Sequence, residues 1–193
     1  MQSPERTELT DGSLLLRPWR LEDVPRVAQI CADPEISRWT RVPFPYTEEH
    51  ARTWIEQTVH DWDSGEGEAA FAVTEATSGE VVGAIGLRPM HEEYGVRGSI
   101  GYWVAAEARG RGVATGALKL VSRWGLGLLG LPRVELVTDP ENEASQRVAE
   151  KAGFRREGLL RSYLQMPNGR RDVVMFSLLA DELEDAEAGR DSA

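Results

Sequence analysis

The chain has 193 residues, of which 41% are hydrophobic and 28% are charged, values ordinary for a single soluble globular domain. No apolar run approaches the roughly 20 residues that cross a bilayer, residues 1–10 lack the apolar core of a signal peptide, and the single cysteine, Cys31, excludes an internal disulfide and a multi-cysteine metal site. We therefore expect a cytoplasmic protein with no metal and no membrane partner. The formal charge of −10 argues against nucleic acid as a partner; half of it falls in residues 181–193, so we expect one domain over residues 1–180 and an acidic, disordered tail.

Apolar periodicity and turn residues predict an alternation of strands and helices along this domain. Strands are predicted at residues 13–19, 69–75, 81–90, 96–105, 133–138, 154–166 and 171–179. Helices are predicted at residues 21–32, 47–63, 113–128 and 142–152, with a proline-marked loop from Asp33-Pro34 to Pro45. Thr47 is expected to cap its helix without a capping box, because His50 stands where an acid or glutamine is needed. This order predicts an α+β fold with a mostly antiparallel sheet.

One turn combines glycines and arginines at the start of a predicted helix. The segment Arg109-Gly110-Arg111-Gly112-Val113-Ala114 follows an apolar strand and opens the helix. Glycines let the backbone turn tightly and approach a ligand closely, and the first N–H groups of a helix have no partner within the helix. Together with the positive end of the helix dipole, these N–H groups suit a phosphate. The turn therefore predicts a site for a phosphorylated cofactor.

Further segments carry a resemblance to a known family, in the same order and at matching spacing. They are residues 14–19, Ile100-Gly101-Tyr102-Trp103-Val104, the turn with Arg109, Gly112 and Ala114, Asp139-Pro140-Glu141-Asn142 with Ser145, Lys151-Ala152-Gly153-Phe154, and Gly169-Arg170-Arg171-Asp172. From about Leu9 to Leu179 the chain resembles the GNAT superfamily of N-acetyltransferases, and within it the branch that acetylates the N-termini of ribosomal proteins. The resemblance implies the GNAT fold, with six to seven strands, helices on both faces of the sheet, and a V-shaped opening between residues 98–105 and 133–138.

The resemblance also implies an enzyme that transfers an acetyl group from acetyl-CoA directly to an amine. The pantetheine arm would pair with the backbone near Tyr102, and the amides before Val113 would bind the pyrophosphate. The residues implied to bind the cofactor are Tyr102, Trp103, Val104, Arg109, Gly110, Arg111, Gly112, Val113, Ala114 and Asn142. For the two arginines, an alternative is solvated surface charge or pairing with Glu107. The family also contains homodimers, which leaves the oligomeric state open.

The departing thiolate needs a proton, and its donor differs within the family. Many members carry a tyrosine seven residues after the helix asparagine, where this chain has Ala149. The ribosomal branch carries a serine three residues after that asparagine, and Ser145 stands there. We therefore expect Ser145 to donate the proton, with Asn142 contacting the cofactor arm. A plainer alternative, compatible with the first, makes Asn142 a helix cap.

The base that takes the proton of the amine is less determined by the sequence. Many relatives carry a glutamate directly before the Ile-Gly-Tyr-Trp segment, where this chain has Ser99. Glu135 on the opposing strand is the leading candidate, acting directly or through a water. Alternatively it points to solvent or pairs with an arginine, and Glu92 and Glu93 are further candidates. An α-amine has a pKa near about 7.7–8.0, so part of it is already neutral and a dedicated base is not required.

The acceptor is expected to be a protein N-terminal α-amine, as in the branch that the chain resembles. Trp39 and Tyr46 in the proline-marked loop, and Tyr163 in the last hairpin, are candidates for contact with it. Cys31 has apolar neighbours on a helix and is expected to pack rather than react, which favours direct transfer. Two alternatives stay open: acetylation or succinylation of a small-molecule amine, and a non-catalytic sensor that binds acyl-CoA.

Overall fold

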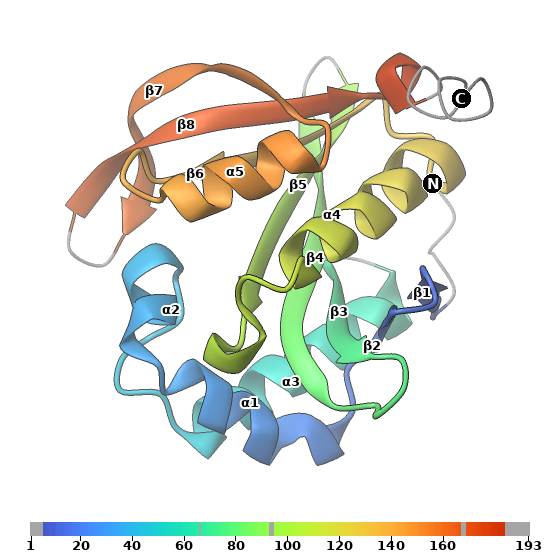
Figure 1. Cartoon of the computed structure of the whole chain (residues 1–193), viewed down its shortest axis with the longest axis vertical. Coiled ribbons are helices and arrows are strands. Elements are labelled where there is room, and N and C mark those ends of the chain that lie inside the picture. Colours follow the sequence, from blue (N-terminus) through green and yellow to red (C-terminus); the bar gives the residue numbers. More distant parts are fainter. Residues whose placement is uncertain (1–5, 66, 93–94, 167–168, 184–193) are drawn as a thin grey trace.

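The computed structural model describes residues 6–65, 67–92, 95–166 and 169–183, which form an α+β fold (Figure 1). The strands are β1 (Leu9–Thr10), β2 (Leu14–Pro18), β3 (Ala69–Glu75), β4 (Val81–Glu92), β5 (Gly95–Val104), β6 (Arg133–Thr138), β7 (Arg155–Met166) and β8 (Gly169–Leu179). The helices are α1 (Val24–Cys31), α2 (Pro34–Trp39), α3 (Glu48–Ser64), α4 (Val113–Arg123) and α5 (Glu143–Lys151). Short turns of 3-10 helix, η1 (Leu21–Asp23) and η2 (Ala106–Ala108), and a π-helical turn, η3 (Trp124–Leu128), complete the described elements.

All described strands belong to one sheet with the order β1-β2-β3-β4-β5-β6-β8-β7. Seven of them lie where the sequence predicts strands. The eighth is the two-residue β1, which is too short to show a hydrophobic period and takes the sheet one strand beyond the expected size. Every neighbouring pair is antiparallel except β5 and β6.

The parallel contact between β5 and β6 is brief. It joins Gly98 to Val134 and Ser99 to Glu135, and beyond this point the two strands run on without pairing, to Val104 and Thr138. The sheet therefore splays open along the second half of β5. This confirms the V-shaped opening expected from the resemblance.

The helices occupy two opposite faces of the sheet. Tyr102 points to Ser145 of α5, since their hydroxyl oxygens lie 2.8 Å apart. The next residue, Trp103, points to the other face, where its ring centroid lies 6.3 Å from that of Trp54 in α3. Helices α4 and α5 pack against one another and over β4, β5 and β6, so they cover the Tyr102 face.

Helix α2 corrects the expectation of an irregular loop after the first helix. The Asp33 side chain accepts a hydrogen bond from the Glu35 N–H (2.9 Å), and Pro34 occupies the first helical position. Asp-Pro is a turn signal, but the same pair also suits a helix start, because Asp caps and Pro needs no N–H partner there. Trp39 consequently closes a helix instead of lying in a loop.

The start of α3 also differs from expectation. Thr47 accepts a hydrogen bond from the His50 N–H (3.3 Å), as predicted for a cap. However, His50 Nδ1 accepts a hydrogen bond from the Thr47 N–H (3.2 Å), which completes a capping box. An imidazole nitrogen therefore accepts the hydrogen bond that a glutamate or glutamine side chain usually accepts in a capping box.

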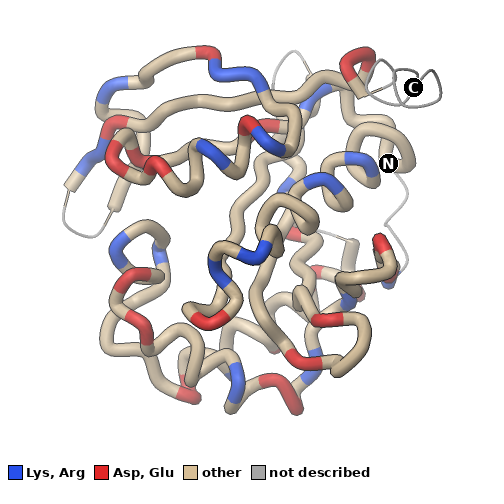
Figure 2. The backbone as a smooth tube through the Cα atoms, viewed as in Figure 1, with Lys and Arg blue, Asp and Glu red and all other residues tan. Residues whose placement is uncertain are grey.

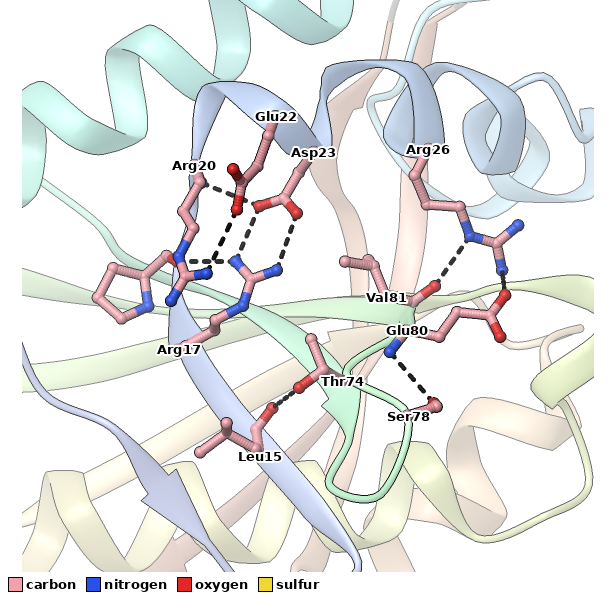
Figure 3. A network of polar contacts seen from close by, with 11 residues as sticks. Leu15, Arg17, Arg20, Glu22, Asp23, Arg26, Thr74, Ser78, Glu80 and Val81 are labelled. Atoms are coloured by element: carbon pink, nitrogen blue, oxygen red, sulfur yellow. Dashed lines mark hydrogen bonds and ion pairs between the residues drawn. The ribbon is translucent and has the colours of Figure 1, made fainter.

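A buried ion pair fixes the connection between β2 and η1 (Figure 3). Both nitrogens of the Arg17 fork donate to the Asp23 carboxylate, at 2.8 Å each, and Asp23 Oδ2 also accepts the Arg20 N–H (2.9 Å). Arg17 and Asp23 are 7% and 6% exposed. Such charges are tolerated in the interior only because they are paired and hydrogen-bonded.

The folded part of the chain extends beyond residue 180, into the segment expected to be a tail. Residues 180–183 are helical, and Glu182 pairs with Arg155 (2.8 Å) and accepts the Leu179 N–H (3.0 Å). The rest of the expected tail, residues 184–193, lies outside the described residues. Within the described part of the chain, no helix is both long and apolar enough to span a membrane.

Candidate active site

A cleft of about 1340 Å³ follows the opening between β5 and β6 and continues toward α2 and α3. It gathers side chains from six parts of the chain that are distant in sequence. All the predicted site residues line it except Arg111: Trp39, Tyr46, Tyr102, Trp103, Val104, Arg109, Gly110, Gly112, Val113, Ala114, Glu135, Asn142, Ser145 and Tyr163.

The glycine turn at the start of α4 has the backbone that its sequence predicts. Gly110 and Gly112 have φ angles of 76° and 82°, in the left-handed region that favours glycine. A Cβ would meet nothing within 4 Å at either position, so conformation and not crowding requires glycine there. The first hydrogen bond of the helix runs from the Gly116 N–H to the Gly112 carbonyl (2.9 Å). Among the described residues, the amides from Gly110 to Thr115 therefore find no backbone acceptor, and they fit the phosphate site expected there.

Both arginines of this turn are paired with carboxylates. Figure 2 shows basic residues along the tube that leads into α4. Arg109 binds Asp33 (2.6 Å) and the Val104 carbonyl (3.2 Å), and Arg111 binds Glu75 (2.6 Å). Glu107, the partner considered from the sequence, pairs instead with Arg26 (2.5 Å). A phosphate that binds either arginine would share the guanidinium with this carboxylate or replace it.

Ser145 lies at the centre of the opening. Its Oγ is 2.8 Å from the hydroxyl of Tyr102. Burial raises the pKa of this tyrosine, because it outweighs the lowering effect of the hydrogen bond to Ser145. Asn142 caps α5, because its side chain accepts the Ser145 N–H (3.0 Å). Ala149, where many relatives carry tyrosine, is fully buried. The tyrosine beside this serine thus comes from β5 and not from α5.

Glu135 is held between two arginines. Arg97 Nε donates to its Oε1 (2.7 Å) and Arg133 Nε donates to its Oε2 (3.2 Å), while the residue is only 5% exposed. Arg133 also forms a fork with Glu157, at 2.6 Å to each oxygen. The structure therefore places Glu135 in the cleft wall as the arginine-paired residue that the sequence left as an alternative. Of the other base candidates, Glu93 and the side chain of Glu92 lie outside the described residues.

The three aromatic candidates for acceptor contact lie around the same cleft. Trp39 stacks beneath Arg38 (4.4 Å from guanidinium carbon to ring centroid), and its ring N–H donates to Glu35 (3.2 Å). Tyr46 lies against His50, and burial raises its pKa. Tyr163, at 42% exposed, is contributed to the cleft by β7.

Two charged contacts in the cleft were missed by the sequence analysis. Arg88 binds Glu68 (2.8 Å), and Arg171 donates to the carbonyl of Arg38 (2.9 Å), linking β8 to α2. Pairing of β4 with β5 places Arg88 opposite Ser99, and a single sequence does not give this register.

The splayed sheet and the glycine turn at the adjoining helix are the arrangement that the resemblance implies for an acyltransferase that uses acetyl-CoA. The chain belongs to the GNAT family, since the family described as Acetyltransferase (GNAT) domain matches residues 13–155. It is 34% identical over 170 residues, 88% of this chain and 94% of the relative, to an uncharacterized N-acetyltransferase, p20, of Bacillus licheniformis. It is 30% identical to the spermidine N(1)-acetyltransferase of Escherichia coli, over 77% of this chain and 76% of the relative. Mycobacterium smegmatis RimJ, solved in complex with CoA-disulfide, superposes with a TM-score of 0.77 at 27% identity, over 94% of this chain and 90% of RimJ. The family and the enzyme class expected from the sequence are confirmed.

Proposed function

We propose that this N-acetyltransferase transfers the acetyl group of acetyl-CoA to the α-amine at the N-terminus of a protein, as in the ribosomal-protein branch. The similarity to RimJ supports this acceptor class. The observation that carries the chemistry is the Tyr102–Ser145 hydrogen bond of 2.8 Å inside the opening. The pair lines the cleft at this opening, so it would lie near the sulfur of a thioester that enters between β5 and β6.

The donor would be held by groups that the fold leaves available. The amides from Gly110 to Ala114 would bind the pyrophosphate, and the backbone of β5 near Tyr102, Trp103 and Val104, which β6 does not pair, would hydrogen-bond to the pantetheine arm. Arg109 and Arg111 would exchange their carboxylates for phosphate oxygens. Asn142 would remain the cap that orients Ser145.

The reaction proceeds by direct attack of the neutral amine on the thioester carbonyl. As the tetrahedral intermediate collapses, the carbon–sulfur bond breaks and the thiolate takes a proton from Ser145 Oγ. Ser145 recovers a proton from Tyr102, which is reprotonated from solvent. Glu135 is the base expected from the sequence; because arginines engage both of its oxygens, it would act only by exchanging one of them.

A small cationic amine is the second candidate acceptor. The similarity to a spermidine acetyltransferase and the net charge of −10 both favour it. Succinyl transfer and a non-catalytic acyl-CoA sensor have no such observation in their favour.

Thiol release distinguishes these functions. The protein is incubated with acetyl-CoA and either a peptide with a free N-terminal serine, the same peptide with a blocked N-terminus, or spermidine. Release with the free peptide alone supports the protein acceptor, and release with spermidine alone supports the small amine. Binding of acetyl-CoA without release on any acceptor would support the sensor.

A further inference from the structure

The two faces of β5 divide the cleft between donor and acceptor. Tyr102 faces Ser145 and the helices α4 and α5, which carry the proposed pyrophosphate site. Trp103 faces α3 through Trp54. Because α4 and α5 carry the proposed donor site on the first face, we assign the acceptor amine to the α3 face, where α2 and α3 contribute to the lining.

Two glycines line the cleft on this α3 face, so no side chain rises from the sheet at their positions. Gly101 shares the face of Trp103, since the two residues are separated by one position in β5. Its direct partner in β4 is Gly86. A Cβ at Gly101 would meet nothing within 4 Å, whereas a Cβ at Gly86 would overlap the Oε1 atom of Glu68. The carboxylate of Glu68 therefore lies over Gly86, beside the open floor at Gly101.

Arg88 holds this carboxylate in place. Its Nη2 lies 2.8 Å from Glu68 Oε2, and its direct partner in β5 is Ser99, where the resembling family often carries a glutamate. Glu68 Oε1 makes no hydrogen bond with any described residue, and the side chain is 31% exposed to the cleft that it lines. The carboxylate on the α3 face thus belongs to Glu68, the residue before β3, and not to a residue at position 99.

We propose that Glu68 binds the ammonium group of the acceptor and takes one of its protons. This inference rests on the proposed acetyl transfer. The ammonium gives its first proton to Glu68, which releases it to solvent. The neutral nitrogen then forms the bond to the acetyl carbon and loses a second proton to solvent. The thiolate leaves and takes one proton through Ser145, so the products are the amide, free CoA and one proton.

The experiment compares wild type with Glu68→Gln, which keeps the shape of the side chain and an acceptor for Arg88. The acceptors are the free N-terminal-serine peptide, spermidine, and hydroxylamine, an amine that is uncharged near neutral pH. Because hydroxylamine also cleaves thioesters without an enzyme, the rate without protein is subtracted for every acceptor. For the cationic acceptor that wild type uses, kcat/KM should fall about 10- to 100-fold, the effect expected for a lost hydrogen bond between charged groups. With hydroxylamine the change should stay below about threefold, and acetyl-CoA affinity by calorimetry should be unchanged.

Controls separate this role from a structural one. Asp63→Asn removes an exposed carboxylate of α3 that pairs with Arg6 and does not line the cleft, and it should behave as wild type. Gly86→Ala should reproduce the loss with cationic acceptors, because its Cβ displaces the carboxylate. Equal activity of Glu68→Gln and wild type on all three acceptors would overturn the inference, as would the same charge-dependent loss in Glu135→Gln but not in Glu68→Gln. Absence of thiol release by wild type on every acceptor would instead overturn the proposed function.

Discussion

The hydroxyl of Tyr102 in β5 lies 2.8 Å from Oγ of Ser145 in α5, and this contact joins a strand at the opening of the sheet to the helix that covers it. The two side chains come from elements 43 residues apart. Neither side chain alone could protonate a thiolate in the same way, because the serine is a weak acid and the phenol is buried. As a pair they form a short path for one proton.

Substitution of this pair tests whether it acts as a unit. Ser145→Ala should lower kcat by about 10²-fold or more, the usual effect of losing a general acid. Tyr102→Phe should lower kcat less, and the double variant should be no slower than Ser145→Ala, because residues in one chain of proton transfer are not additive. Steady-state rates measure this, with acetyl-CoA affinity by calorimetry expected to stay constant. Multiplicative effects in the double variant would contradict the relay.

Gly112→Ala tests the turn before α4. Alanine with a φ of 82° costs about 1–2 kcal/mol, so acetyl-CoA affinity should fall by about tenfold if the turn relaxes. Gly127→Ala is the matched control: a Cβ there also meets nothing within 4 Å, but its φ lies outside the left-handed region. Calorimetry with acetyl-CoA should show wild-type affinity for the control, and equal affinities for both variants would argue against the turn as the binding site.

Removal of one partner from the buried pair of Arg17 and Asp23 should destabilise the fold. Asp23→Ala leaves a buried guanidinium unpaired and should lower the free energy of unfolding by about 3–5 kcal/mol. The exposed pair of Arg20 and Glu22 offers a control, and Glu22→Ala should change stability by about 1 kcal/mol or less. Urea unfolding measures both, and similar values for the two variants would show that burial of the pair is unimportant.

Glu157 should contribute to the acid sensitivity of the fold. Hydrogen bonds, first from Arg133 and then from Ser177, lower its pKa from 4.5 to about 2. Its charged form stabilises the native state above the unfolded pKa, and this stabilisation is lost as pH falls toward 2. Wild type should therefore lose more stability than Glu157→Gln between about pH 5 and about pH 2, by an amount reduced by solvent screening since the side chain is 41% exposed. Glu143→Gln, which breaks an exposed pair on α5, should show the wild-type loss in urea titrations.

Local features of the chain could be predicted where one segment determines them. The turn with Gly110 and Gly112, the cap by Asn142 and the strand over residues 133–138 depend on neighbours in sequence, and they lie where expected. Helix α2 was missed because Asp33-Pro34 is compatible with both a turn and a helix start. Local pattern could not separate the two.

Contacts between distant segments could not be predicted from local sequence pattern. The pairing of Glu135 with Arg97 depends on where β5 and β6 touch, and the position of Glu68 over Gly86 depends on the register of β4. A single sequence gives the face alternation of each strand but not its alignment with the next one. The resemblance supplied candidate residues for both the donor and the acceptor, whereas the position of Glu68 required the folded sheet.

Asp33 serves two groups with its two carboxylate oxygens: Oδ1 caps α2 and Oδ2 holds Arg109. The cap is the main reason why the pKa of this carboxylate lies below its usual value, and the arginine is a lesser one. Its negative charge consequently stays stabilised by the helix end after the guanidinium turns to another anion. In the proposed binding of the nucleotide, Arg109 would therefore leave Asp33 without leaving this carboxylate uncompensated, and the helix that ends at Trp39 would keep its cap.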